Sequence, residues 1–182
     1  MNPQPDSLIA GTSPRTSPHW STTDGRVIRN RQLPGKELHY AVIEISELAH
    51  PPAAGQFFMV SAGEEPSPTL LRRPMSVARC WRESGGYRLG FLYPAVGVGT
   101  RALAASQRSW KMLGPLGRGY PLVSDAPAIL VAGGRGVAPL IFLAEELAER
   151  GRSAVLLNGA RTADELCSPA EMGAPPLASG SI

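Results

Sequence analysis

The sequence predicts a small antiparallel β barrel over residues 24–122, followed over residues 123–172 by a partial α/β unit. Two observations predict this order. Up to residue 122 the apolar stretches are short and are separated by glycine and proline, which number 20 and 18 in the 182-residue chain. That pattern is typical of short strands joined by turns. Beyond residue 122 two continuous apolar runs flank a segment with helical spacing, which indicates a strand, a helix and a second strand.

The elements of the barrel are bounded by turn signals. Pro34-Gly35 separates the first two strands, and Ser84-Gly85-Gly86 separates a later pair. Gly114-Pro115-Leu116-Gly117 is expected to be the turn that ends the last strand. A short helix is expected at about residues 100–105. The six expected strands cover residues 26–33, 37–45, 55–60, 74–80, 87–93 and 110–113.

The α/β unit begins with residues 128–132, a continuous apolar run typical of a parallel strand that is covered on both faces. A helix is expected over residues 138–150, because its leucines keep helical spacing and Gly151 is a suitable stop. Residues 154–158 form the second apolar strand. Two parallel strands and one helix, joined by a right-handed crossover, indicate a domain that is cut short.

Composition argues against several classes of protein. No apolar run approaches the length of a membrane span, and residues 1–23 lack the apolar core of a secretory signal, so a cytoplasmic protein is expected. Cys80 and Cys167 are the only cysteines, which excludes a disulfide framework and a four-cysteine metal site. The three histidines have no spaced partners. Residues 1–23 and 173–182 show no hydrophobic period and are expected to be disordered.

Positive charge is concentrated in one part of the chain. The net charge is only +3, but residues 72–135 contain ten basic side chains against Glu83 and Asp125, a net charge of +8. A nucleic-acid surface would explain this cluster. Aromatic side chains that could stack on bases are few, however, and the arginines lie among glycine turns. The pyrophosphate of a dinucleotide is therefore the better interpretation, and no nucleic-acid partner is expected.

The segment Arg73-Pro74-Met75-Ser76 combines a cation, a stiff backbone and a small hydroxyl. Arginine binds phosphate oxygens through two N–H groups, and proline keeps the residue before it extended. Serine can hydrogen-bond the edge of a heteroaromatic ring. The set suits a dinucleotide, although a basic edge strand with a surface serine explains these four residues equally well.

Two glycine turns are further candidates for anion binding. Gly97-Val98-Gly99-Thr100 opens a helix, whose free N–H groups attract anions, but Thr100 could be only a helix cap. Gly133-Gly134-Arg135-Gly136 lies between a buried strand and a helix, where doubly wound folds bind phosphates. It does not match G-x-G-x-x-G and could be a tight structural turn. Tyr93 could stack on a flat ring or be an ordinary core tyrosine, and Arg161 could approach a cofactor or be solvated.

Taken in order, these motifs resemble the ferredoxin reductase superfamily. The resemblance is narrower to the electron-transfer subunit of NAD-dependent dihydroorotate dehydrogenase, an enzyme of pyrimidine synthesis. It covers roughly residues 25–165, and the ordered set is far more specific than any one motif. The motifs that carry it are Arg73-Pro74-Met75-Ser76, Leu92-Tyr93, Gly99-Thr100, Gly114-Pro115-Leu116-Gly117 and the segment from Gly133 to Pro139.

The resemblance implies an FAD-binding barrel and a Rossmann-like nicotinamide domain. Arg73 would hold the FAD phosphates, and Gly99 and Thr100 would take the pyrophosphate. Further FAD contacts would come from Pro74, Met75, Ser76, Leu92, Tyr93 and Pro94. The phosphate loop for NADH would consist of Gly133, Gly134 and Gly136. In such subunits electrons pass from NADH to FAD, and then singly through a [2Fe-2S] cluster to a flavin on a catalytic partner subunit.

Three departures from that family bear on the prediction. Pro94 stands where a basic residue is more usual, and Arg135 replaces a small or apolar residue. The four clustered cysteines and the further parallel strands of the family are absent from this chain. An FAD-binding electron-transfer subunit is the leading hypothesis. The alternatives are a ferredoxin–NADP reductase or sulfide dehydrogenase-like flavoprotein subunit, and a truncated scaffold fragment without catalytic activity.

Overall fold

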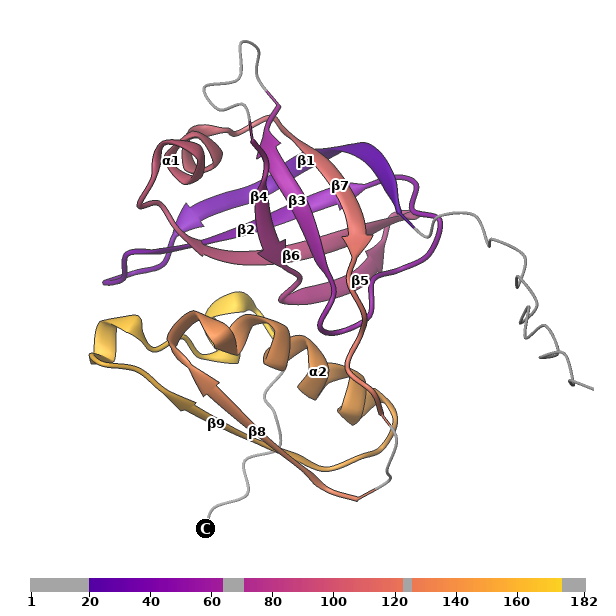
Figure 1. Cartoon of the computed structure of the whole chain (residues 1–182), viewed down its shortest axis with the longest axis vertical. Helices are drawn as coiled ribbons and strands as arrows, with labels where there is room; N and C mark the ends of the chain where they lie inside the picture. The colour runs from indigo at the N-terminus through magenta and orange to yellow at the C-terminus, as the bar shows by residue number, and fades with distance from the viewer. Residues whose placement is uncertain (1–19, 64–70, 123–125, 175–182) are drawn as a thin grey trace, which may run out of the picture.

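A computed structural model of the protein describes residues 20–63, 71–122 and 126–174. Figure 1 shows two parts, a strand barrel formed by residues 20–63 and 71–116 and a smaller α/β part formed by residues 128–174. The disorder expected for residues 1–19 and 175–182 concerns segments outside the described residues. Within the described ranges, no helix is long and apolar enough to cross a membrane.

The barrel is one curled antiparallel sheet with the strand order β4-β3-β7-β1-β2-β6-β5. This confirms the predicted fold class, with seven strands in place of the six expected. Among its described residues it has one α-helix, α1 (Val98–Ala105), which connects β6 to β7. The strands are β1 (Ser21–Gln32), β2 (Leu38–Ile45), β3 (Phe57–Ala62), β4 (Arg73–Ser76), β5 (Arg79–Glu83), β6 (Gly86–Pro94) and β7 (Ser109–Leu116).

The extra strand arises because the segment expected to be one strand, residues 74–80, changes its partner. Val77 donates its N–H to the carbonyl of Gln56, beside β3, at 3.1 Å, whereas Ala78 donates to the carbonyl of Gly90 in β6 at 2.8 Å. The chain therefore leaves one edge of the sheet as β4 and joins the other edge as β5. This crossing closes the barrel and leaves a seam between β4 and the end of β6.

Two predicted strand boundaries are wrong. Strand β7 runs through the expected turn to Leu116, and it ends where Gly117 takes a φ of +80°. Gly114 belongs to the strand because the ring of Phe58 lies against it, and a Cβ there would be 2.4 Å from that ring. Strand β1 begins at Ser21, inside the expected tail, because residues 21–26 pair with β7.

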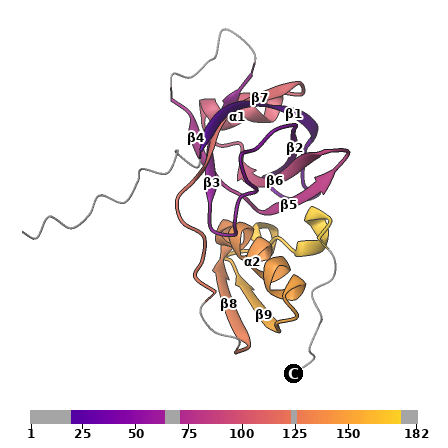
Figure 2. The ribbon, with the colours of Figure 1, turned by 90° about the vertical axis from the view of Figure 1, so that its right-hand side faces the viewer.

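The α/β part is a strand, a helix and a parallel second strand, as predicted. It comprises β8 (Ala128–Gly133), α2 (Val137–Glu149) and β9 (Ala154–Gly159), and β8 pairs with β9 in parallel from Ala128 to Gly133. Three short 3-10 turns complete it: η1 (Gly134–Gly136), η2 (Ala163–Glu165) and η3 (Pro169–Met172). Figure 2 shows α2 between the barrel and these two strands.

The expectation that β8 is covered on both faces is wrong. Leu130 and Ala132 are buried toward α2, but Ile129 and Val131 are 72% and 71% exposed. On β9, Val155 and Leu157 are also exposed. One helix covers one face of the pair, and within the described part of the chain nothing covers the other face.

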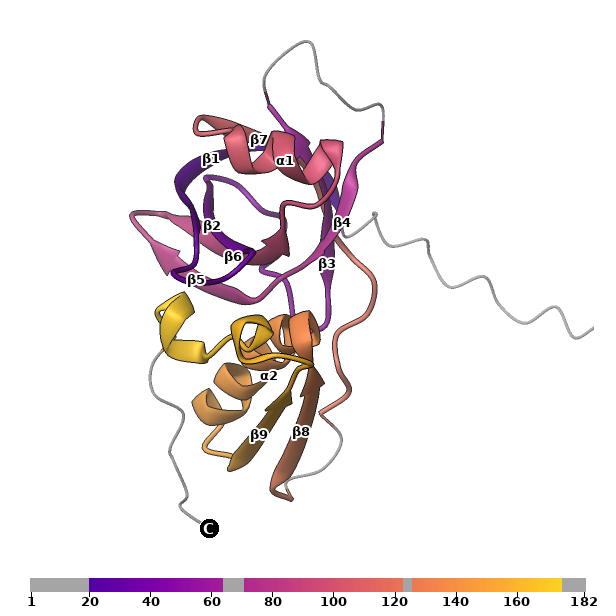
Figure 3. The ribbon, with the colours of Figure 1, turned by 90° about the vertical axis from the view of Figure 1, so that its left-hand side faces the viewer.

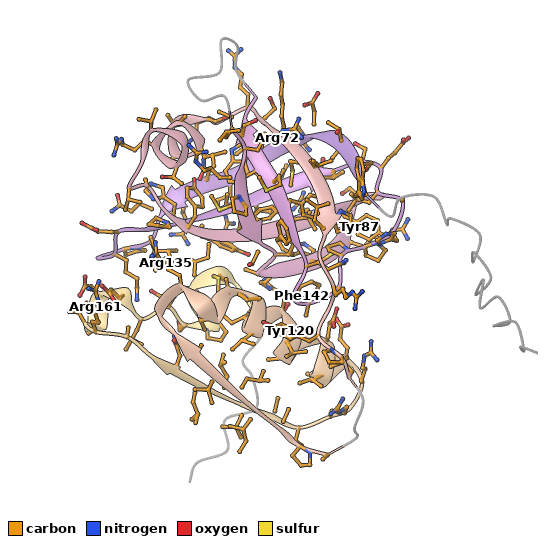
Figure 4. The ribbon with its side chains drawn as sticks, in the orientation of Figure 1. Arg72, Tyr87, Tyr120, Arg135, Phe142 and Arg161 are labelled. Atoms are coloured by element: carbon orange, nitrogen blue, oxygen red, sulfur yellow. The ribbon has the colours of Figure 1, made fainter. Side chains whose placement is uncertain are left out.

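The two parts share a continuous apolar core. Phe142, Leu143 and Leu147 of α2 belong to the same buried cluster as Val60 and Trp110 of the barrel. Phe142 lies between α2 and the lower side of the barrel in Figure 4. The apolar contact therefore attaches α2 to the barrel as well as to its own sheet, which keeps the cleft between the two parts in a defined place.

Candidate functional site

The seam of the barrel brings together two of the predicted motifs. Strand β4 pairs only with β3, so its other edge is open, and Figure 3 shows α1 beside β4 at this place. The guanidinium of Arg73 lies against Gly99 in the first turn of α1. A Cβ added at Gly99 would be 2.7 Å from Nε and 2.9 Å from Nη2 of Arg73. Only a glycine leaves room for this contact without moving the arginine.

The first turn of α1 presents free amides on the side of Arg73. The first hydrogen bond within the helix runs from the N–H of Arg101 to the carbonyl of Gly97, at 2.9 Å. Helix geometry leaves the amides of Val98, Gly99 and Thr100 without a partner in the helix. The Thr100 hydroxyl is occupied locally, since it accepts a bond from the Gly97 N–H at 3.0 Å. The guanidinium and the backbone amides are therefore the groups that could donate to an anion here, while the Thr100 hydroxyl is bonded to Gly97.

Strand β4 presents alternate residues to the outside. Pro74 and Ser76 are exposed, whereas Met75 is only 8% exposed and belongs to the barrel core. The Met75 side chain therefore faces away from the open surface, and only its backbone could touch a ligand there. Arg73 donates from Nη1 to the carbonyl of Leu71 at 2.9 Å, which restrains the guanidinium at the end of the strand.

Tyr93 is a core tyrosine, the second of the two interpretations that the sequence left open. Its ring is 1% exposed and lies edge-on to Trp110 with 5.7 Å between the ring centroids. Its hydroxyl donates to Oδ1 of Asn30 at 2.7 Å, and Nδ2 of Asn30 donates to the carbonyl of Leu103 at 2.7 Å. Burial raises the pKa of the Tyr93 hydroxyl. Tyr93 thus supports the end of α1 from inside the barrel.

Leu92 and Pro94, the other two predicted site residues on β6, lie in different surroundings. Leu92 is 7% exposed and packs in the apolar cluster that joins β2 to the start of α2. Pro94 lines the cleft between the barrel and the α/β part. The chain runs from Pro94 through Val96 directly to Gly97, so one short segment connects the cleft to the amides of α1.

The cleft has a volume of about 660 Å³. Arg135 and Arg161 lie at the same end of the molecule, facing this cleft from the α/β part (Figure 4). Twelve residues line it. Those from the barrel are Glu37, Leu38, Pro94 and Val96, and those from the α/β part are Gly133, Gly134, Arg135, Gly159, Ala160, Arg161, Asp164 and Glu165.

The predicted glycine loop forms one wall of the cleft. Gly133 and Gly134 line it, and Gly136 caps the N-terminus of α2. A Cβ at any of the three would meet nothing within 4 Å, so these glycines leave open space beside the start of the helix. Gly134 has a φ of +51°, a conformation that favours glycine. The loop is thus an open backbone surface that a phosphate could approach.

The charges of the cleft are mixed. Arg161 forms an ion pair with Glu165 at 2.6 Å and holds the pKa of that carboxyl below its usual value. A hydrogen bond from Thr162 lowers the pKa of Asp164. Arg135 has no ion-pair partner in the described part of the chain. It is the cation that remains available to a ligand, whereas Arg161 is already neutralised.

Sequence reasoning missed the acidic residues of the cleft, Glu37, Asp164 and Glu165. They lie in turns far apart in the sequence, at the start of β2 and after β9. No local pattern marks such residues, because the packing of α2 on the barrel is what brings them to one cleft. Asn30 was also missed, since a single asparagine in a strand carries no recognisable signal.

The described residues contain no group of three or more metal-binding side chains. Cys80 and Cys167 are the only cysteines of the sequence. Burial raises the pKa of the Cys80 thiol to about 12 and that of Cys167 to about 11. A [2Fe-2S] cluster needs four thiolates. These residues therefore do not fit the cluster that the resemblance implies.

Comparison with known proteins identifies relatives of the chain, although no family model matches it. It is 38% identical over 126 residues to the electron transfer subunit of dihydroorotate dehydrogenase B (NAD(+)) from Desulforamulus reducens, a match that covers 68% of this chain and 47% of that subunit. The subunit from Bacillus cereus is 32% identical over 143 residues, which cover 76% and 54% of the two chains.

This chain is a homologue of these electron transfer subunits. It spans about half the length of the curated relatives that it matches. The predicted resemblance is thereby confirmed.

Solved structures show the same fold. The ferredoxin reductase of carbazole 1,9a-dioxygenase superposes with a TM-score of 0.68 at 19% identity, over 86% of this chain and 47% of the other. Phthalate dioxygenase reductase gives a TM-score of 0.63 at 20% identity, over 78% of this chain and 44% of the other. The homologue therefore has the fold of ferredoxin reductase-type proteins.

Proposed function

We propose that this homologue binds FAD in the seam of the barrel and passes electrons from NADH toward a dihydroorotate dehydrogenase catalytic subunit. The observation that carries the proposal is the contact between Arg73 and Gly99, because it places a guanidinium beside three free amides of a helix start. A cation and a helix N-terminus at one point form a site for a pyrophosphate.

The described residues fit FAD at this place. Arg73 and the amides of residues 98–100 would hold the pyrophosphate, and the exposed Pro74 and Ser76 on β4 would lie along the flavin. The same ligand would extend past Pro94 into the cleft, because the segment from Pro94 to Gly97 connects the cleft to the start of α1. When bound, FAD would accept a hydride from NADH and a proton from solvent, leaving NAD⁺ and a two-electron-reduced flavin.

The residues of the cleft fit a nicotinamide dinucleotide. Gly133, Gly134 and Gly136 would admit its pyrophosphate to the start of α2, and Arg135 would supply a positive charge. Three carboxylates and two guanidinium groups line the cleft, and one guanidinium is already paired. This excess of negative charge favours NADH over NADPH, whose 2′-phosphate would add two negative charges. It argues against the ferredoxin–NADP reductase alternative.

The proposal assigns no step to an iron–sulfur cluster in this chain, because Cys80 and Cys167 alone cannot form one. The partner is proposed from the names of the relatives, which are electron transfer subunits of dihydroorotate dehydrogenase B. A co-purification with such a catalytic subunit tests that part separately from FAD binding.

The FAD site is tested by titrating the apoprotein with FAD and comparing Arg73→Met with Arg72→Met. The three atoms nearest to a Cβ at Gly99 all belong to Arg73, so the adjacent Arg72 is the matched control. Charge-assisted hydrogen bonds contribute about 1.5–3 kcal/mol. We therefore expect an FAD Kd about 10 to 150 times higher for Arg73→Met. Equal Kd values for the two variants would contradict the site, and no FAD binding by the wild type would favour the scaffold alternative.

A further inference from the structure

Helix α2 carries two successive carboxylates that are each bound by the barrel. Oε1 of Glu145 lies 2.6 Å from Nε of Arg79 on β5. The next residue, Glu146, accepts the backbone N–H of Ala54, in the loop before β3, at 3.0 Å. These two contacts attach one point of the helix to two separate parts of the barrel.

Arg79 also binds the chain segment that follows the cleft-lining residues 159–165. Its Nη1 donates to the carbonyls of Met172 at 3.2 Å and of Gly173 at 2.5 Å, at the end of η3. Its guanidinium lies 5.1 Å from the ring centroid of Trp81. One arginine of the barrel therefore joins β5, α2 and η3, using the fixed fork of its donors.

If the ion pair of Arg79 and Glu145 served only to attach α2 to the barrel, its free-energy cost would be high. Their side chains are only 14% and 12% exposed, and burying two charges carries a desolvation penalty that an apolar pair avoids. The apolar contacts of Phe142 and Leu143 already attach α2 to the barrel. Apolar contacts have no preferred direction, whereas hydrogen bonds do. The ion pair thus adds directional bonds to the apolar contacts that already place α2 on the barrel.

The orientation of α2 determines the width of the cleft. The helix begins at Val137, directly after the glycine loop, and the clamped Glu145 lies nine residues beyond Gly136. At 1.5 Å per residue, about 13 Å of helix separates Glu145 from the glycine loop. A tilt of about 5° around the clamped point moves the loop by about 1 Å, and such a displacement at a reacting centre can slow a reaction about 100-fold.

We propose that Arg79 is a positioning residue, which through Glu145 and the η3 carbonyls fixes the glycine loop of α2 relative to the flavin side of the cleft. The part of this inference that concerns hydride transfer rests on the proposed function. The geometric part does not, because it concerns the placement of α2 on the barrel with or without a cofactor.

Arg79→Met tests the inference, with Arg82→Met as the matched control. Both arginines lie on β5, but Arg82 is exposed and contacts the ring of Tyr87. The geometric part is measured as the spin-label distance distribution between cysteines introduced at Arg31 and Val155, which are exposed on β1 and β9. We expect a shifted or broadened distribution for Arg79→Met and no change for Arg82→Met. An unchanged distribution in Arg79→Met would overturn the inference, whether or not FAD binds.

The reaction is measured as the stopped-flow reduction of bound flavin by NADH. Arg79→Met should load FAD as the wild type does, because Arg73 and Gly99 remain in place, and its limiting reduction rate should fall at least about 10-fold. Its apparent Kd for NADH should change less, and Arg79→Lys should recover part of the rate. A rate within twofold of the wild type at full flavin loading would overturn the positioning role. A wild type that takes up no FAD would instead contradict the proposed function.

Discussion

Replacing Gly99 by alanine separates the role of the seam in ligand binding from its role in stability. The added Cβ would be 2.7 Å from Nε, 2.9 Å from Nη2 and 3.0 Å from Cζ of Arg73. Ordinary contacts begin at about 3.4 Å, so the guanidinium must move by roughly 0.5–1 Å. It is the far end of a flexible side chain, so it can move at little cost to folding.

The two consequences of Gly99→Ala have opposite signs. Gly99 lies in the first turn of α1, where alanine favours the helix by up to about 1 kcal/mol. Moving the guanidinium removes up to one charge-assisted bond to the ligand, about 1.5–3 kcal/mol. We expect an unfolding midpoint in urea equal to or above that of the wild type, and an FAD Kd about 10 to 150 times higher.

The assay is a fluorescence titration of the apoprotein with FAD, and Gly97→Ala is the control. A Cβ at Gly97 would lie 3.9 Å from its nearest neighbour, the hydroxyl of Thr100, so it leaves Arg73 in place. FAD binding as tight as that of the wild type in Gly99→Ala would refute the assignment. An equal loss in both variants would refute it too, because the loss would then follow from any change in this turn.

Three further predictions concern the core, the sheet and the thiols. Tyr93→Phe leaves the Asn30 carbonyl oxygen without its donor, so the free energy of unfolding should fall by about 1–3 kcal/mol while the FAD Kd stays the same. A loss of FAD affinity without a loss of stability would restore Tyr93 as a ligand contact. Leu130→Ala should cost about 2–5 kcal/mol in urea unfolding, whereas Ile129→Lys on the exposed face should stay within about 0.5 kcal/mol, and similar costs would contradict the one-sided burial of β8. Burial raises the pKa of the two thiols to about 12 and about 11, so neither should react with iodoacetamide at pH 8 until the protein unfolds. Because the unfolded thiols lose their protons first, stability should fall as the pH rises above about 9, and alkylation of the folded protein would contradict the burial.

The sequence predicted which motifs occur, but not how they meet. Arg73 and Gly99 were both identified as candidates from local patterns. Their contact depends on the curl of a sheet whose order places β4 and the end of β6 at the same seam. The change of partner at Val77 and Ala78 has no sequence signal, because neither residue differs from those of an ordinary strand.

The burial of the Tyr93 ring could have been predicted from the strand pattern alone. Leu89, Phe91 and Tyr93 share the alternate positions of β6, and all three are buried in the barrel. A period of two places the tyrosine on the inner face with them. The resemblance to a flavoprotein family favoured the ligand role instead. The exposed face of β8 was a different case, since a continuous apolar run does not reveal whether both of its faces are covered.

FAD binding and reduction by NADH are tested together by the visible spectrum of the purified, FAD-loaded protein, recorded before and after NADH is added without oxygen. We expect the two absorption bands of oxidised flavin, no iron–sulfur absorption, and bleaching of both bands by NADH, with a slower response to NADPH. A colourless protein that takes up no added FAD would contradict the barrel site. A bound flavin that NADH fails to bleach would contradict the role of the cleft.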